Sequence, residues 1–432
     1  MIAESLLTGM MRRQVRRILR FPHTGGEGIG PPTPDPERGY LLYAHVPFCE
    51  ELCPYCSFNR VRLEPALATR YFDSLERELQ LYRESGWRFT AAYVGGGTPT
   101  VLPDRLGGFL RRARELWPIE TVSVETNPNH LTPQVLERLE EAGVSRLSVG
   151  VQSFDDGILK AIGRYERYGS GREIAARLEG LQGRFDTVNV DLIFNYPGQS
   201  EEMFLRDLAT LRTLAVDQVT LYPLMAARGV RRRLEELGRI DPRLEQRLYG
   251  RIWEQLGDQY EPSSAWCFSR RKSPAGAGQK AAPPPRLIDE YVVDHEEYAG
   301  LGSGSFGYAG GSIYANTFVI PEYIERIARG QLPVVAARRF SRGERVRYDF
   351  LMRLFGGTLD LRELEGRHGP GAARRLWKEL AFLRLTGALE RRGAGGGVLA
   401  LTRRGYYFWV ILMREFFTGV NNFREQVLAG AA

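Results

Sequence analysis

The sequence predicts an α/β fold in which six β-strands alternate with helices. Short runs rich in β-branched and aromatic residues are separated by longer segments whose apolar residues recur at helical spacing. This alternation is typical of right-handed βαβ units and a parallel sheet, either open and doubly wound or closed into a partial (β/α)6 barrel. The predicted strands span 41–46, 91–95, 121–126, 146–151, 187–194 and 218–223, and the predicted helices span 66–82, 105–116, 133–142, 171–181 and 201–214.

Residues 1–38 precede this array and form a basic segment followed by a linker. Apolar side chains and arginines recur at the spacing of a helix with one apolar and one basic face. Such a helix either docks on the protein body with its arginines in solvent, or lies on an anionic membrane surface. The stretch from His23 to Gly39 carries glycine and proline pairs, which predict the linker. The arginines are Arg12, Arg13, Arg16, Arg17 and Arg20, and the apolar residues are Leu6, Leu7, Met10, Met11, Val15, Ile18, Leu19 and Phe21.

Two further regions follow the βα array, which is predicted to occupy residues 39–235. Residues 236–337 are predicted to extend the array. Within them, the segment 270–286 is rich in Lys, Ala, Gly and Pro, cannot build a core, and is predicted to be a mobile surface insertion. From 338 to 432, helical periodicity is followed by a glycine-rich stretch, a β-like run and an apolar, aromatic tail. This order predicts a helical, winged-helix-like cap, which on an enzyme more often covers the active site than binds DNA.

Length, hydropathy and charge exclude several classes of protein. At 432 residues the chain is long enough for one large catalytic domain with smaller flanking units. No apolar run approaches the roughly 20 residues that cross a bilayer, and no leader with a cleavage site is visible. A cytoplasmic protein is therefore expected, peripheral to the inner membrane surface if its first helix binds lipid. Outside that helix, the basic residues behind the net charge of +7 are mixed with acids, so no nucleic-acid partner is predicted.

Three of the four cysteines lie within eight positions, directly after the first predicted strand. Such crowding suits a metal or cluster site in a reducing compartment better than a disulfide framework. The spacing is Cys49-x-x-x-Cys53-x-x-Cys56, so three thiolates can ligate three irons of a [4Fe-4S] cluster and leave the fourth iron open to a chelating molecule. Zinc is the alternative, but it usually takes four ligands at paired close spacing, and the only other cysteine is the distant Cys267.

This cysteine spacing resembles the signature of the radical S-adenosylmethionine (SAM) superfamily. In that superfamily the open iron binds the amino and carboxylate groups of SAM. The segment Gly95-Gly96-Gly97-Thr98-Pro99 follows the second predicted strand, and absent Cβ atoms let its backbone approach a ligand closely. The resemblance implies that this segment hydrogen-bonds the amino group of SAM.

Four further blocks resemble one branch of the superfamily, the oxygen-independent coproporphyrinogen III dehydrogenase family. This family also includes haem chaperones and class C radical SAM methyltransferases. The resemblance covers residues 40–223 and implies a partial (β/α)6 radical SAM barrel that binds a [4Fe-4S] cluster and SAM. The blocks are Tyr43-Ala-His45-Val-Pro47-Phe48-Cys49, Val124-Glu125-Thr-Asn127-Pro128, Leu147-Ser-Val-Gly150-Val151-Gln152-Ser153-Phe154 and Asn189-Val-Asp191-Leu-Ile193.

The same resemblance implies roles for individual residues. An arginine can fork onto the carboxylate of SAM, and an aspartate can accept hydrogen bonds from its ribose hydroxyls. Taken alone, each such residue is equally well explained as an ordinary polar residue satisfied by its neighbours. Aromatic residues beside a cluster either stack on the ligand or exclude water. The matched SAM-contacting residues are Glu125, Gln152, Arg164 and Asp191, and the aromatic residues are Tyr43 and Tyr55.

The chain departs from the coproporphyrinogen dehydrogenases at an informative position. Those enzymes carry another cysteine two residues after the third cluster cysteine, where this chain has Phe58. This departure, with the differing segment 221–225, favours branches that are thought to place a second SAM beside the first. The hypothesis is a C-methyltransferase that uses two SAM molecules to methylate an sp2 carbon of a large planar apolar acceptor, at C8 of the menaquinone ring. The segment from Arg414 to Arg424 resembles quinone-methylating members of the family.

Two other functions stay open. A tetrapyrrole enzyme, for coproporphyrinogen III decarboxylation or haem breakdown, would need a similar broad apolar pocket, and a haem chaperone would keep the cluster without turnover. An electron donor such as flavodoxin or ferredoxin is expected for an enzyme. Tyr298 or His295, just before a glycine-rich turn, is predicted to take the proton lost after radical addition, with a structural turn as the alternative. His45 and His295 are the candidates for haem ligation, although one histidine without a partner is a weak signal.

Overall fold

The computed structural model describes residues 2–21, 30–271, 290–392 and 397–430. Six neighbouring parallel strands form the centre of the sheet, and they are the six that the sequence predicts. Residues buried on both faces, as in Val188–Val190 on one central strand, explain their apolar composition. The strands are β1 (Tyr40–Val46), β4 (Phe89–Gly96), β5 (Thr121–Thr126), β6 (Arg146–Gln152), β7 (Thr187–Phe194) and β8 (Gln218–Pro223).

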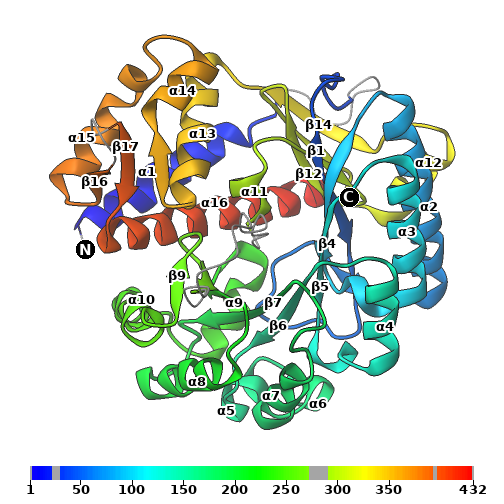
Figure 1. Ribbon diagram of the computed structural model, residues 1–432, viewed down its shortest axis with the longest axis horizontal. Helices are drawn as coiled ribbons and strands as arrows, with labels where there is room; N and C mark the ends of the chain where they lie inside the picture. The colour runs from blue at the N-terminus through cyan, green and yellow to red at the C-terminus, as the bar shows by residue number, and fades with distance from the viewer. Residues whose placement is uncertain (1, 22–29, 272–289, 393–396, 431–432) are drawn as a thin grey trace, which may run out of the picture.

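Helices connect these strands and cover the outer side of the sheet (Figure 1). Their starts are encoded locally: Ser170 and Glu173 form a capping box at one of them, and the Ser200 hydroxyl accepts a hydrogen bond from the Met203 amide at another. Two short helices, α5 (Asp156–Ala161) and α6 (Tyr165–Tyr168), were not predicted. The predicted ones are α2 (Pro65–Glu84), α3 (Pro103–Leu116), α4 (Pro133–Glu141), α7 (Gly171–Glu179) and α8 (Glu201–Leu214).

The segment 236–337 adds strands to both edges of the same sheet. At one edge, β11 (Tyr298–Leu301) pairs parallel with β1, and three antiparallel strands follow it; at the other edge, two antiparallel strands extend β8. The predicted mobile insertion at 270–286 lies almost entirely outside the described residues. The remaining elements are α9 (Arg228–Leu237), α10 (Pro242–Leu256), β9 (Tyr260–Pro262), β10 (Cys267–Arg270), α11 (Tyr291–Asp294), β12 (Phe306–Ala309), β13 (Ser312–Asn316), α12 (Ile320–Ala328) and β14 (Val334–Arg339).

The C-terminal region is a helical cap with a small sheet, as the sequence predicts. Its three antiparallel strands lie in the order β15-β17-β16, and a long final helix runs back toward the large sheet (Figure 1). This arrangement confirms an α/β fold with a helical C-terminal region. The elements are α13 (Arg342–Phe355), β15 (Thr358–Asp360), α14 (Leu361–His368), α15 (Trp377–Leu385), β16 (Leu389–Arg392), β17 (Val398–Leu401) and α16 (Arg403–Gly430).

The N-terminal helix α1 (Ile2–Ile18) packs along α16. Its apolar residues Leu7, Met11 and Val15 are buried there, and the Arg12 guanidinium pairs with Glu415 of α16 at 2.6 Å. Docking on the protein body is therefore the alternative that the structure supports, because the apolar face that would enter a membrane is covered. Among the described residues, no helix is both long and apolar enough to span a bilayer.

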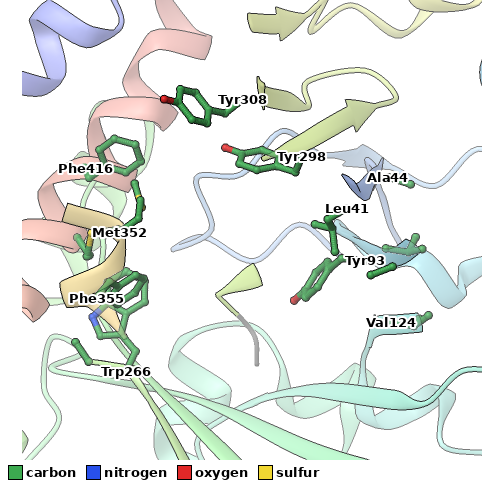
Figure 2. Close-up of a cluster of buried hydrophobic side chains, with 14 of the residues drawn as sticks. Leu41, Ala44, Tyr93, Val124, Trp266, Tyr298, Tyr308, Met352, Phe355 and Phe416 are labelled. Atoms are coloured by element: carbon green, nitrogen blue, oxygen red, sulfur yellow. The ribbon is translucent and has the colours of Figure 1, made fainter. Parts of the chain in front are cut away.

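One hydrophobic core joins the sheet to the cap. Figure 2 shows Leu41, Tyr93 and Val124 of the sheet in the same buried cluster as Phe355 and Phe416 of the cap. Aromatic contacts cross the boundary; for example, the rings of Trp266 and Phe355 lie 5.1 Å apart. The cap is thus held in place by continuous apolar packing, and its position over the carboxyl ends of the strands is part of the fold.

Candidate functional site

The cysteine loop projects from the carboxyl end of β1 and is closed at its base. Two short strands, β2 (Phe48–Cys49) and β3 (Val61–Arg62), pair in parallel. The Val61 amide donates to the Pro47 carbonyl at 2.7 Å, and the Leu63 amide donates to the Cys49 carbonyl at 2.8 Å. Because both ends of the loop are fastened, the chain between them holds Cys53 and Cys56 beside Cys49.

The three thiols lie in an environment that a cluster would complete. Cys49 and Cys53 are buried, and burial raises the pKa of the Cys49 thiol to about 12 and raises that of Cys56. Such thiols become thiolates only when positive charge binds them, as iron does. In the described ranges, no three His, Cys, Asp or Glu side chains converge on one metal ion, whereas in a cubane each cysteine takes a different iron. The geometry fits a [4Fe-4S] cluster better than a single zinc ion.

The glycine segment packs so closely against this loop that larger side chains would not fit between them. A Cβ on Gly97 would come within 2.6 Å of the Phe48 carbonyl oxygen and 3.0 Å of the Cys49 sulfur. Gly96 has a φ of +117°, which disfavours other residues. The Thr98 amide donates to the Phe48 carbonyl at 2.8 Å, so the pairing of the two chain segments continues past the strand ends.

Glu125 stands at the end of β5 and faces the glycines. A Cβ on Gly95 would meet its carboxylate at 2.5 Å. The Tyr93 hydroxyl donates to Glu125 at 2.9 Å, and the Gly96 amide donates to it at 3.1 Å. The carboxylate is therefore held in a fixed orientation while its residue lines the cavity described below.

A chain of hydrogen bonds links two of the cluster sulfurs. Thr98 Oγ1 donates to Cys49 Sγ at 3.7 Å, and Asn127 Nδ2 donates to Thr98 Oγ1 at 2.7 Å. Arg164 then donates to Asn127 Oδ1 at 2.9 Å and to Cys53 Sγ at 3.7 Å, as well as to the Gly150 carbonyl. Asn127 was not among the predicted site residues, although it stands in the same sequence block as Glu125.

Gln152 ends β6, and Asp191 lies three residues before the end of β7. Gln152 has a φ of +76°, a left-handed conformation that is unusual outside glycine and recurs at functional sites. The Asp191 carboxylate accepts a hydrogen bond from Ser148 at 3.0 Å and another from Asn189 at 2.7 Å. Both residues line the same cavity as Arg164.

These side chains surround one cavity of about 200 Å³ at the carboxyl ends of the strands. The predicted residues on its wall are Cys49, Cys53, Cys56, Tyr43, Tyr55, Gly96, Gly97, Thr98, Glu125, Gln152, Arg164 and Asp191. Gly95 lies directly behind the Glu125 carboxylate. The lining also includes Phe58, Ile193, Tyr222, Pro223, Leu224 and Met225, which we call the apolar side and which were not among the predicted site residues.

His45 is a structural residue beside the site. Its Nε2 lies 2.8 Å from the Asn59 carbonyl, which only accepts, so Nε2 carries the proton and Nδ1 accepts from Tyr43 Oη at 3.0 Å. Burial lowers its pKa to about 4. Both ring nitrogens are occupied, so His45 has none left to ligate haem.

Tyr298 and His295 do not reach this cavity. Tyr298 pairs in register with Leu41, near the amino end of β1, whereas the cysteines follow its carboxyl end about 17 Å away at 3.3 Å per residue. Its ring is packed in the core (Figure 2), and burial raises its pKa to about 12. The ring centroid lies 5.1 Å from that of Tyr291. His295 lines a second cavity, and burial lowers its pKa. The geometry therefore does not support the predicted role of either residue as proton acceptor.

Side chains near the end of α16 hydrogen-bond to the residues that follow the third cysteine. Asn421 donates to the Ser57 hydroxyl at 2.8 Å, and Arg424 donates to the Phe58 carbonyl. Ser57 and Phe58 directly follow Cys56, so the C-terminal helix helps to set the position of the third sulfur. No local signal in the sequence predicted this contact between residues more than 360 positions apart.

Comparison with known proteins identifies the superfamily that the cysteine spacing resembles. A model of the radical SAM superfamily matches residues 43–211. The haem chaperone HemW of Mycobacterium tuberculosis is 30% identical over 317 residues, which cover 70% of this chain and 77% of that protein. The oxygen-independent coproporphyrinogen III oxidase of Paracoccus denitrificans is 30% identical over 323 residues, 71% of this chain and 70% of that protein. The solved structure of coproporphyrinogen III oxidase (HemN) from Escherichia coli shares the fold, with a TM-score of 0.71 over 88% of this chain and 91% of that one, at 20% identity.

Fold and site together define a radical SAM protein. The chain belongs to the radical SAM superfamily and, within it, to the family that contains the haem chaperone HemW and oxygen-independent coproporphyrinogen III oxidase. Proteins of this superfamily use a [4Fe-4S] cluster and SAM, which confirms these two predicted cofactors. The cysteines would hold the cluster. Glu125, Gln152, Arg164 and Asp191 line the same cavity as the cysteines, and their contact with SAM stays a prediction.

Proposed function

We propose that this chain is a radical SAM enzyme that acts on a tetrapyrrole. The observation that carries the proposal is the extent of the similarity to its relatives. The superfamily model matches only residues 43–211, whereas the similarity to the haem chaperone and to the coproporphyrinogen III oxidase extends over more than 300 residues. The relatives therefore share more with this chain than the cofactor-binding core, and they are named for haem and coproporphyrinogen.

The residues around the cavity suit turnover as well as binding. When bound, the cluster and SAM supply a 5′-deoxyadenosyl radical that removes a hydrogen atom from another molecule. Arg164 and Asp191 provide a cation and an anion on one wall, which match the carboxylate and the ribose hydroxyls of SAM. The ring of Tyr55 packs edge-on against that of Tyr196, with centroids 5.6 Å apart. Together with Tyr43 it would exclude water from the cysteines. An external one-electron donor such as flavodoxin or ferredoxin belongs to the same proposal.

The acceptor would lie against the apolar side of the cavity. Ile193, Leu224 and Met225 line this side, and Tyr222 packs edge-on against Trp266 at 5.2 Å. Trp266 also contacts Phe417 of α16, with ring centroids 5.6 Å apart. A wall of this kind, backed by the cap, suits a large apolar ring system, and apolar contacts of this type provide most of the binding free energy of such ligands.

Methyl transfer to menaquinone C8 with two SAM molecules remains the second candidate. Phe58 favours it, because it stands in place of the fourth cysteine of the coproporphyrinogen dehydrogenases, lines the cavity and is half exposed. Its ring adds apolar surface where an uncharged quinone could rest. The resemblance of the segment from Arg414 to Arg424 to quinone-methylating members supports the same reading.

Anaerobic reconstitution distinguishes these functions. The full chain with its cluster is incubated with SAM, a reductant and, separately, coproporphyrinogen III, haem or menaquinone, and products are identified by mass. A tetrapyrrole enzyme is expected to form deoxyadenosine together with an altered tetrapyrrole. S-adenosylhomocysteine with methylmenaquinone would instead establish the second candidate. Haem binding that persists in Cys49→Ser, with no SAM cleavage dependent on a tetrapyrrole in the parent protein, would identify a chaperone.

A further inference from the structure

A groove rich in arginine lies beside the cofactor cavity. It has a volume of about 470 Å³ and is formed by one face of α1, the first turn of α9 and the C-terminal part of α16. The polar side chains of Asn422 and Gln426 also line it. We call it the arginine groove; its charged residues are Arg12, Arg16, Arg20, Arg228, Arg231 and Glu415.

The positive charge in this groove is only partly neutralised. Glu415 is shared between Arg12, at 2.6 Å, and Arg414, at 3.2 Å. Arg231 reaches Glu235 only at 3.9 Å, and both side chains are more than half exposed. In the ranges that the structure describes, Arg16, Arg20 and Arg228 form no ion pair. Guanidinium groups gathered in this way repel one another unless an anion lies between them.

The groove and the apolar side of the cofactor cavity are lined by adjacent residues of the chain. Leu224 and Met225 line the cavity, and the next residue, Ala226, lines the groove. Arg228 is three positions after Met225, a distance of at most about 11 Å along the chain. α16 connects the two sites as well, because Asn422 accepts a hydrogen bond from the Arg228 amide at 2.8 Å while its neighbour Asn421 bonds to Ser57 of the cysteine loop.

We infer that the arginine groove binds the carboxylates of the acceptor. This inference rests on the proposed function, since a tetrapyrrole with propionate side chains has an apolar ring and carboxylates at its rim. The ring would lie against Leu224 and Met225, and the carboxylates would reach the guanidinium groups, which bind such anions through paired hydrogen bonds. Menaquinone carries no anionic group, so the groove has no counterpart in that molecule.

The test compares a porphyrin with its uncharged ester. Reconstituted full-length protein is titrated with coproporphyrin III and with its tetramethyl ester, and binding is followed by fluorescence. The free acid is expected to bind on the order of tenfold or more tightly than the ester, since charged hydrogen bonds of this type are among the stronger ones. Raised salt is expected to weaken only the acid, because screening acts on charge.

Paired variants place the effect in the groove. The double variant R16A/R228A is expected to lose about tenfold in affinity for the free acid and none for the ester. The control R13A/R232A removes two arginines from the same helices that do not line the groove, and Arg232 is instead paired with Glu236 at 3.2 Å. Iron content and far-ultraviolet circular dichroism establish that each variant keeps its fold.

Each remaining outcome overturns the inference in a distinguishable way. Equal affinity of the parent protein for acid and ester would overturn the carboxylate role and leave the tetrapyrrole function standing. Binding of neither porphyrin would remove both proposals together. If R16A/R228A instead reduces sedimentation with phosphatidylglycerol vesicles and leaves porphyrin binding unchanged, the groove contacts lipid and the inference is wrong.

Discussion

Two cavities with charged side chains in their walls differ in how completely those charges are paired. The cofactor cavity holds Arg60 and Arg164, and in each of them the buried Nε lacks a hydrogen-bond partner. The second cavity, of about 240 Å³, holds His295 and a network of ion pairs. There, Asp349 pairs with Arg353 at 2.8 Å and with His368 at 3.0 Å.

The difference indicates two kinds of role. In the second cavity, Arg367 of α14 and Arg38, which precedes β1, both bind Glu296, so the network ties the cap to the edge of the sheet. Paired charges of this kind contribute mainly to structure. In the cofactor cavity, donors remain without partners around three thiols, which leaves interactions for a ligand to complete. Of the predicted site residues, His295 lines the second cavity, and Tyr298 lies in the hydrophobic core outside both cavities.

The largest effect is expected from the cysteine loop. Cys49→Ser removes one of three ligands and is expected to abolish SAM cleavage and to lower iron content, measured by deoxyadenosine formation and iron analysis. The matched control is Cys267→Ser, since Cys267 is buried on β10 away from the cavity. That variant is expected to keep its iron. Loss of iron in both variants would contradict the assignment of the site.

Two arginine variants compare the cavities directly. Arg164→Lys is expected to lower the rate of SAM cleavage by about 10- to 100-fold. The Arg164 guanidinium donates hydrogen bonds to the Gly150 carbonyl, the Asn127 side-chain oxygen and the Cys53 sulfur, and a lysine cannot donate to all three in the same geometry. Arg353→Met in the second cavity is expected to lower the free energy of unfolding by about 1–3 kcal/mol without changing SAM cleavage. The comparison fails if Arg353→Met affects cleavage and Arg164→Lys does not.

Two glycine variants test how closely the backbone packs in each region. A methyl group on Gly97 would meet backbone atoms at 2.6 and 2.9 Å, so Gly97→Ala is expected to destabilise the loop by about 1–3 kcal/mol and to lower cluster occupancy. Gly366, in α14 beside the second cavity, has nothing within 4 Å of that position. Gly366→Ala is therefore expected to be neutral or to stabilise by up to about 1 kcal/mol. Thermal unfolding and cluster absorbance would measure both effects.

The smallest effect is expected from histidine titration. The pKa of His45 falls from 6.5 to about 4 on burial, so between these values the unfolded chain binds more protons than the folded one. Stability from this group is complete above pH 6.5 and is lost as the pH falls toward 4, by about 2 kcal/mol between pH 7 and pH 5. His45→Gln is expected to remove that dependence.

His295 provides the comparison for His45. Burial also lowers its pKa, so the sign is the same, but His295 is only partly buried whereas His45 is buried, so His295→Gln is expected to flatten the pH dependence less. Urea unfolding of both variants at pH 7 and pH 5 measures how the free energy of unfolding of each changes with pH. A larger loss of this pH dependence in His295→Gln than in His45→Gln would contradict the prediction.

Much of the sheet and half of the site could be predicted from local pattern. Five of the six predicted strands, such as that at 187–194, have the predicted bounds or differ from them by one residue, because apolar runs between turn signals are properties of neighbouring residues. The cysteines and the side chains at the strand ends lie together for the same reason: parallel strands all present their carboxyl ends at one edge. Asn127 could have been found by this rule.

What the sequence determined by itself was therefore the order of strands and helices, the spacing of Cys49, Cys53 and Cys56, and the side chains that follow each strand. Only the tertiary structure decided that Tyr298 pairs with Leu41 near the amino end of β1, away from the cysteine loop at its carboxyl end. It also decided that α16 returns to hold Ser57, and that arginines of α1 and α9 share one groove. These contacts join residues hundreds of positions apart. No local periodicity encodes them, because they depend on how complete elements pack against one another.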